Sequence, residues 1–114
     1  MSTNYGTILA GPKRRAIYLF TREGGTKPRC FGECEKAWPP VLTKGEPKAA
    51  KGVDGGELGT TKRSDGKRQV TYNGHPLYYW YGDPPGKVLC QAVHEFGGFW
   101  YVVDSRGKAI RAQG

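Results

Sequence analysis

The sequence lacks any run of apolar residues close to the roughly 20 that a helix needs to cross a bilayer, so we expect no transmembrane helix. It also opens, at residues 1–4, without a charged segment followed by an apolar one, and we expect no secretion signal in the printed chain. Signatures of common catalysts are missing as well: there is no Gly-x-Ser-x-Gly, no His-Glu-x-x-His and no phosphate-binding glycine loop. Because no reaction is indicated, the sequence favours a protein that is not an enzyme and leaves enzymatic activity as an open alternative.

What the chain does contain is typical of a small β domain. Its 114 residues include 18 Gly and 8 Pro, and its 3 Trp, 7 Tyr and 4 Phe argue against a disordered chain. The length fits a single domain, residues 1–114, with one modest core. Short segments rich in Tyr, Trp and Val between turn residues predict an all-β fold, a small sandwich or a barrel-like domain, rather than a helical bundle.

The charge balance is strongly basic. Lys and Arg number 18 against 10 Asp and Glu, which gives a formal net charge of +8 at pH 7. Such a balance steers proteins toward acidic polymers, anionic lipid headgroups or nucleic acid. The basic residues occur in short groups beside turns, at 13–15, 62–63 and 67–68, and form no continuous basic helix. We therefore expect solvated loop charges or a surface for acidic polymers or headgroups, with nucleic acid as the weaker alternative.

Three β-hairpins and one short helical turn are predicted from the positions of the turn residues. The hairpins are expected at residues 8–20, 68–81 and 99–110. Asn73-Gly74 is the strongest two-residue turn signal in the chain. A helical turn is expected over residues 33–37. Residues 43–56 are rich in Lys, Gly and Ala, which predicts an exposed connector.

The sequence repeats itself at an offset of 60 residues. Residues 17–23 align with residues 77–83, and both follow the pattern aliphatic-Tyr-x-aromatic-x-x-acid. A duplicated hairpin unit packed about a pseudo-twofold axis explains this repeat economically. The predicted units are residues 5–42 and residues 57–114, the second of which includes the C-terminal hairpin.

Strand alternation places two aromatic rings of each unit on one face of its strand. The four rings are those of Tyr18, Phe20, Tyr78 and Trp80. We expect them to pack in the core, because each ring buries a large apolar area. Glu23 and Asp83 follow just after the strand ends, where a carboxylate accepts hydrogen bonds from nearby backbone N–H groups. Metal ligation or proton transfer is the alternative role for these two acids.

With these motifs the chain resembles a bacterial family, the secreted-repeat lipoproteins defined by a Tyr-x-(Phe/Trp/Tyr)-x-x-Asp motif. Further landmarks of the resemblance are Cys30–Cys34, Ala37–Pro40 with Trp38, Arg63–Gly66, Gln69–Tyr78 and Phe96–Trp100. The resemblance implies an extracytoplasmic protein, and the family has no established biochemical role. Glu23 stands where the motif has Asp and keeps the carboxylate. No lipobox cysteine is present, so the chain gives no support for lipidation.

The three cysteines cannot all pair within one chain. The offset of 60 aligns Cys30 with Cys90 and Cys34 with His94. Because the family is exported, one disulfide is the default, either Cys30–Cys34 or Cys30–Cys90 across the pseudo-axis. The alternative is a zinc, copper or haem-related site built from all four side chains. Three intervening residues in each pair, instead of two, depart from the common zinc spacing.

The leading functional prediction is an exported, non-enzymatic binding or structural module of the cell envelope, with acidic wall polymers or lipid headgroups as partners. The alternative is a metal or redox protein that uses the four-residue site just described. Nucleic-acid binding would require Tyr79 and Tyr81 to be exposed beside arginines. His75 lies beside a turn, where we expect an ordinary surface histidine.

Overall fold

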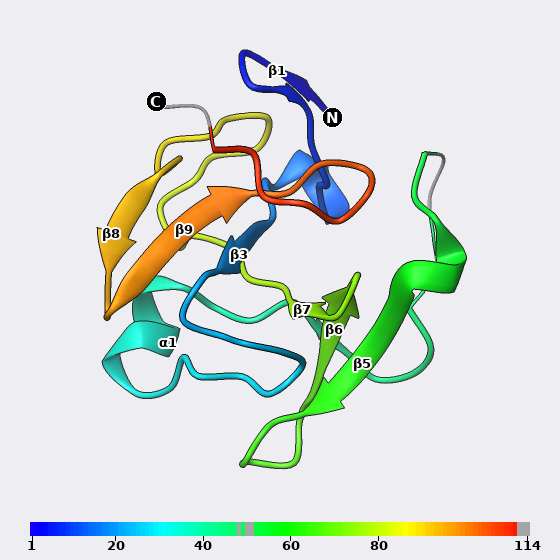
Figure 1. Cartoon of the computed structure of the whole chain (residues 1–114), viewed down its shortest axis with the longest axis vertical. Coiled ribbons are helices and arrows are strands. Elements are labelled where there is room, and N and C mark those ends of the chain that lie inside the picture. Colours follow the sequence, from blue (N-terminus) through cyan, green and yellow to red (C-terminus); the bar gives the residue numbers. More distant parts are fainter. Residues whose placement is uncertain (48, 50–51, 112–114) are drawn as a thin grey trace.

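A computed structural model describes residues 1–47, 49 and 52–111 of the chain (Figure 1). Its strands are β1 (Ser2–Thr3), β2 (Gly6–Thr7), β3 (Tyr18–Phe20), β4 (Leu42–Thr43), β5 (Leu58–Lys62), β6 (Arg68–Tyr72), β7 (His75–Pro76), β8 (Val93–Glu95) and β9 (Gly98–Val102). The helical elements are α1 (Glu33–Ala37) and the 3-10 turns Pro12–Arg14 and Gly55–Glu57. The prediction of an all-β domain with short helical turns is therefore confirmed.

The described strands pair antiparallel in three sheets. The first holds β1 and β2, the second has the order β3-β9-β8, and the third has the order β4-β6-β5 with β7 also on β6. Figure 1 shows β8, β9 and β3 on one side of the molecule and β5, β6 and β7 on the other. The three sheets do not close into a barrel.

The pair β3 and β9 lies between two groups of buried side chains. The aromatic cluster includes Tyr18, Phe20, Cys30, Trp38, Tyr78, Trp100 and Val102. The aliphatic cluster includes Leu9, Ile17, Leu19, Val41, Val70, Leu77, Tyr101 and Val103. Successive residues of a strand face opposite sides, so Leu19 and Tyr101 pair across the strands on the aliphatic side. Because both of its faces are covered, β3 is buried at every position.

Local turn chemistry fixes two of the predicted elements. Asn73 and Gly74 both have positive φ values, 51° and 77°, as a tight two-residue hairpin requires, and they join β6 to β7. The helical turn expected over residues 33–37 is α1.

The other two predicted hairpins are shorter than expected. In each of them the two arms are joined by an isolated bridge: Ala10 with Ala16 in the first, and Val103 with Ala109 in the last. The strands β3 and β9 that the arms contain pair with each other instead. The long-range pairing of β3 with β9 therefore takes the place of the two local hairpins that the turn residues predict.

Five strands, β1, β2, β4, β5 and β8, lie outside the three predicted hairpins, and part of the connector also differs from the sequence prediction. β5 pairs with β6 along five residues and β8 pairs with β9, and neither strand was predicted. Thr43, the first residue of the predicted connector 43–56, belongs to β4 and pairs with Arg68. Residues 48, 50 and 51 of this connector lie outside the described residues. The boundaries of the two repeat units stay a prediction.

Candidate functional site

The tyrosines that the repeat aligns meet in the interior. The Tyr18 N–H donates to the Tyr78 carbonyl at 2.8 Å, and the Tyr78 N–H donates to the Tyr18 carbonyl at 3.0 Å. Tyr18 also pairs with Val102, and Tyr78 pairs with Pro40. Each tyrosine therefore contacts residues of the other predicted unit.

The side chain of each tyrosine also bonds to the other predicted unit, at the acid of its motif. The Tyr18 hydroxyl donates to Asp83 Oδ2 at 2.6 Å, and the Tyr78 hydroxyl donates to Glu23 Oε2 at 2.5 Å. All four residues are at least nine-tenths buried. Burial, together with the adjacent carboxyl group, raises the pKa of each tyrosine. Both hydroxyls are therefore protonated donors over the physiological pH range.

Each of the two acids also receives a backbone hydrogen bond from a residue six positions later. The Leu89 N–H donates to Asp83 Oδ1 at 2.9 Å, and the Arg29 N–H donates to Glu23 Oε2 at 2.8 Å. The acids thus accept backbone N–H bonds in the role that strand-end carboxylates commonly take. The two sites differ in one respect: Asp83 divides its donors between two oxygens, whereas Glu23 takes both on Oε2.

Burial raises the pKa of both acids. The pKa of Glu23 rises from its usual 4.5 to about 7, mainly because burial disfavours the charged form, while the Tyr78 hydrogen bond and the charge of Arg63 act in the opposite direction. Burial raises the pKa of Asp83 as well. Glu23 is therefore a buried carboxyl group that gains and loses its proton near neutral pH.

Stacked indoles fill the space between the two tyrosine–acid pairs. The Trp38 and Trp100 rings are parallel, with centroids 4.0 Å apart and planes 6° apart. Phe20 stacks on Trp100, also at 4.0 Å. The tyrosine rings meet the indoles edge-on, Tyr18 against Trp38 at 5.1 Å and Tyr78 against Trp100 at 5.2 Å. These contacts place Trp38 and Trp100 at the centre of the aromatic cluster.

Arg63 is part of the interior, although the sequence suggested a loop charge. Only 2% of its surface is exposed. Its guanidinium donates to Gln69 Oε1 at 2.7 Å, to the Cys30 carbonyl at 2.5 Å and to Glu35 Oε1 at 2.6 Å. It also lies 4.4 Å from the centre of the Phe31 ring. The expectation of a solvated charge is wrong at this position, because four partners replace water around the cation.

The cysteines form the local disulfide. Cys30 and Cys34 are bonded, with their Cα atoms 5.2 Å apart, so the alternative Cys30–Cys90 pairing is wrong. Cys90 is a free, half-buried thiol whose pKa burial raises to about 11. His94 is exposed and lies edge-on against Phe99 at 4.8 Å.

This pairing bears directly on the predicted four-residue metal site. Two of its sulfurs are joined to each other, and a disulfide does not supply the thiolate ligands that zinc or copper prefers. The described residues hold no group of three His, Cys, Asp or Glu side chains placed to bind a metal ion. The structure therefore does not assemble the predicted site.

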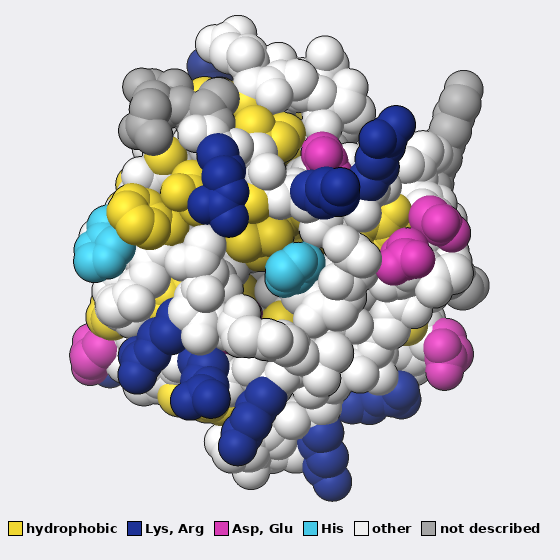
Figure 2. Space-filling view, viewed as in Figure 1, with side chains coloured by type: hydrophobic (Ala, Val, Ile, Leu, Met, Phe, Trp, Pro, Cys, Tyr) yellow, Lys and Arg dark blue, Asp and Glu magenta, His cyan; other side chains and the backbone are white. Residues whose placement is uncertain are grey.

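An open cavity of about 420 Å³ lies beside Glu23. Its lining includes Leu19, Thr21, Glu23, His75, Lys108 and Arg111. Figure 2 shows a hollow on this face of the molecule, with a histidine at its edge and Lys and Arg side chains nearby. His75 keeps intermediate exposure and lines the wall of this open cavity, and burial lowers its pKa.

A row of aromatic side chains continues from the cavity along β9. The Arg111 guanidinium lies 4.9 Å from the centre of the Tyr101 ring, and Tyr101 stacks on Phe99 at 5.8 Å. Phe99 is 42% exposed. Arg111 therefore covers the ring of the buried Tyr101, and Phe99 presents the accessible ring of the stacked pair. Nothing in the local sequence marks Lys108 or Arg111 as neighbours of Glu23.

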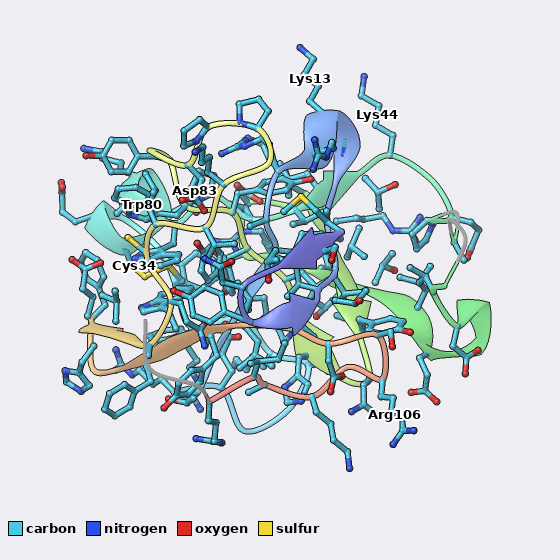
Figure 3. All side chains as sticks on the ribbon, turned by 90° about the horizontal axis from the view of Figure 1, so that it is seen from above. Lys13, Cys34, Lys44, Trp80, Asp83 and Arg106 are labelled. Carbon is cyan, nitrogen blue, oxygen red and sulfur yellow. A yellow bond between two sulfur atoms is a disulfide. The ribbon has the colours of Figure 1, made fainter. Side chains whose placement is uncertain are left out.

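The aromatic residues after Tyr78 lie nearer the surface. Trp80 is half-buried against Trp38, at a centroid distance of 6.4 Å, rather than fully inside the core. Tyr79 is half-buried beneath Arg15, and Tyr81 is 66% exposed. Figure 3 shows Trp80, Asp83 and Cys34 on one side of the molecule, while Lys13 and Lys44 project from its edge.

One segment of the chain matches the model of a known family. Residues 59–104 match the model of a family described as a secreted repeat of unknown function. The matched segment runs from β5 to just beyond β9 and contains Tyr78, Asp83 and Trp100. No curated protein and no solved structure matches the chain. In the described part of the chain, no helix has the length and apolar character of a membrane span.

Proposed function

We propose that this chain, whose residues 59–104 are a secreted repeat of the family just named, is a non-enzymatic binding module outside the cytoplasm. The ligand we propose is an acidic polymer of the cell envelope. The observation that carries this proposal is the open cavity, where Lys108, Arg111 and His75 gather on one face. The family supports the location, and the cavity supports the binding role.

The charges at the cavity suit an anionic partner. Lys108 and Arg111 are both exposed, and among the described residues neither forms an ion pair with a carboxylate. The formal net charge of +8 adds a long-range attraction toward polyanions. A cation that forms no ion pair within the protein can form charge-assisted hydrogen bonds with a carboxylate or phosphate group of a ligand.

The test is binding to a soluble acidic polymer, polyglutamate, over a range of salt concentrations. We expect affinity to fall by about tenfold or more from low salt to several hundred millimolar, because the charges are exposed and screened. The double variant Lys108→Ser, Arg111→Ser should bind several-fold more weakly than the parent.

The matched control is the double variant Lys13→Ser, Lys44→Ser, which removes the same net charge from exposed residues outside the cavity lining. It should bind nearly as the parent does. Salt-independent binding, equal losses in both double variants, or no affinity for any acidic polymer would overturn the proposed function.

A further inference from the structure

One oxygen of Glu23, at the cavity, has no hydrogen-bond partner in the part of the chain that the structure describes. Glu23 is 6% exposed and lines the cavity, and both of its hydrogen bonds reach Oε2. Among the described residues, Oε1 accepts no hydrogen bond. Within residues 1–47, 49 and 52–111, Arg63 Nε is the one fully buried side-chain N or O atom without a partner, so Glu23 Oε1 is not fully enclosed. An acceptor left over beside open space is therefore available to a donor that enters the cavity.

Asp83, which the repeat aligns with Glu23, has no carboxylate oxygen left without a hydrogen bond. Asp83 receives the Tyr18 hydroxyl on Oδ2 and the Leu89 N–H on Oδ1, so both oxygens are in use. The glutamate side chain is one methylene longer than aspartate, and both of its donors share one oxygen. The substitution of Glu for Asp in the first motif thus coincides with a free acceptor at the cavity.

The remaining polar groups of the cavity come from two other segments. His75 belongs to β7, and its lowered pKa leaves a neutral ring that offers one N–H donor and one lone pair. Lys108 and Arg111 follow the last turn of the described chain and supply positive charge. The cavity thus combines the carboxylate oxygen of Glu23, which can accept a hydrogen bond from a ligand hydroxyl, with the neutral His75 ring. Lys108 and Arg111 complete it as a pair of cations that can bind an anion.

The apolar surfaces restrict the ligand further. Leu19 and Ala109 line the cavity, and the exposed Phe99 ring, which stacks on the buried Tyr101 beneath Arg111, adds apolar surface nearby. A volume of about 420 Å³ lies within the usual range for small-ligand sites, roughly 300–1,000 Å³. Sugar rings match this combination, because they present hydroxyl donors at their edge and apolar C–H groups on their faces.

We infer that the cavity binds one acidic sugar unit of the polymer, with a hydroxyl donating to Glu23 Oε1 and the anionic group held by Lys108 and Arg111. His75 forms a further hydrogen bond to the sugar. This inference rests on the proposed function and names its substrate class. An anionic polymer without hydroxyl groups would satisfy the two cations but leave Glu23 Oε1 without a donor.

The experiment compares two carboxylate polymers, polygalacturonate and polyglutamate, by isothermal titration calorimetry at pH 8.5, above the Glu23 pKa of about 7, where Oε1 is an ionised acceptor. We expect polygalacturonate to bind about tenfold more tightly, the ratio that one charge-assisted hydrogen bond provides. Glu23→Asp should bring this ratio close to one, since the shorter acid reproduces the arrangement at Asp83. His75→Ala should also lower the ratio, whereas Glu46→Asp, at an exposed glutamate outside the cavity lining, should leave it unchanged.

The outcomes separate the inference from the proposed function. If neither probe binds, the proposed function fails. If both bind with equal affinity, or if Glu23→Asp keeps the parent's ratio while the variant remains folded by circular dichroism, the sugar inference fails and the proposed function stands. Tighter binding of single-stranded DNA than of polygalacturonate would also overturn the inference.

Discussion

Glu23 combines three properties that rarely occur in one carboxyl group. It is buried, it accepts a tyrosine hydroxyl and a backbone N–H on one oxygen, and it borders an open cavity. Burial holds its pKa at about 7. Its protonation state therefore affects the stability of the fold as well as the charge of the cavity.

The first prediction concerns stability against pH. The pKa of Glu23 is about 7 in the fold and near its usual 4.5 in the unfolded chain. The folded state therefore holds the proton more tightly, and the Glu23 contribution to the unfolding free energy decreases as pH rises from 4.5 to 7. The decrease is on the order of 3 kcal/mol. It should be absent from the Glu23→Gln variant, and urea unfolding at several pH values measures it.

Comparison with the variant is needed because other groups face the carboxyl. Arg29, Arg63 and Tyr78 surround it, and His75 lies on the same cavity. The lowered pKa of His75 reduces stability as pH falls below its usual 6.5, which is the opposite slope. Subtracting the two stability curves cancels the histidine contribution. A difference curve that is flat from pH 4.5 to 7 would contradict the raised pKa of Glu23.

At the scale of elements, the important feature is the crossed pairing of the tyrosine-bearing segments. Tyr18 on β3 bonds to Asp83, and Tyr78, just after β7, bonds to Glu23. The paired segments are fixed twice, once by backbone bonds between the tyrosines and once by side-chain bonds to the acids. Each hydroxyl therefore helps to set how the two segments pack.

The second prediction is a double-mutant cycle on one of these bonds. Tyr18→Phe should lower the unfolding free energy by about 2 kcal/mol, because Asp83 loses a buried donor. When Asp83→Asn is combined with it, the two effects should fall short of additivity by about 1 kcal/mol. Urea unfolding monitored by tryptophan fluorescence measures each value.

The control for this cycle is Tyr81→Phe, since Tyr81 is 66% exposed. It should change stability by less than about 0.5 kcal/mol. Strict additivity of Tyr18→Phe and Asp83→Asn would show that the buried bond contributes no coupling.

The elements also show how far sequence could predict this fold. The repeat at an offset of 60 aligns Tyr18 with Tyr78 and Glu23 with Asp83. The dipeptide Asn73-Gly74 predicts the position of the hairpin turn. These signals are local or periodic. β5 was missed because Leu-Gly-Thr-Thr-Lys carries a weak strand pattern, and its pairing depends on β6.

The candidate site depends even more on long-range structure. Arg63 looks like any basic residue beside a turn, and only its contacts with the Cys30 carbonyl and Gln69 show that it is buried. The cavity joins Glu23, His75 and Lys108 from distant parts of the chain. A single sequence contains no periodicity that would bring such groups together.

At the scale of the whole molecule, neither predicted unit buries its own core. β3 belongs to the first unit and pairs with β9 of the second. Trp38 stacks on Trp100, again across the units, and Arg63 is held by the carbonyl of Cys30. A fragment that holds one unit would expose the aromatic surface that the other unit covers. The fold is thus interlocked, even though its sequence repeats.

The third prediction follows from this interlocking. A chain cut in two, as fragments 1–47 and 52–114, should show no cooperative unfolding in either fragment alone, because β3 and β9 would each lack their partner. Mixed in equal amounts, the fragments should recover the β circular dichroism and the tryptophan emission of the intact protein. Trp100→Ala in the second fragment should prevent recovery, since such a truncation costs about 3–5 kcal/mol. Cooperative unfolding of fragment 52–114 by itself would instead show that the second unit is an independent domain, with the first merely attached to it.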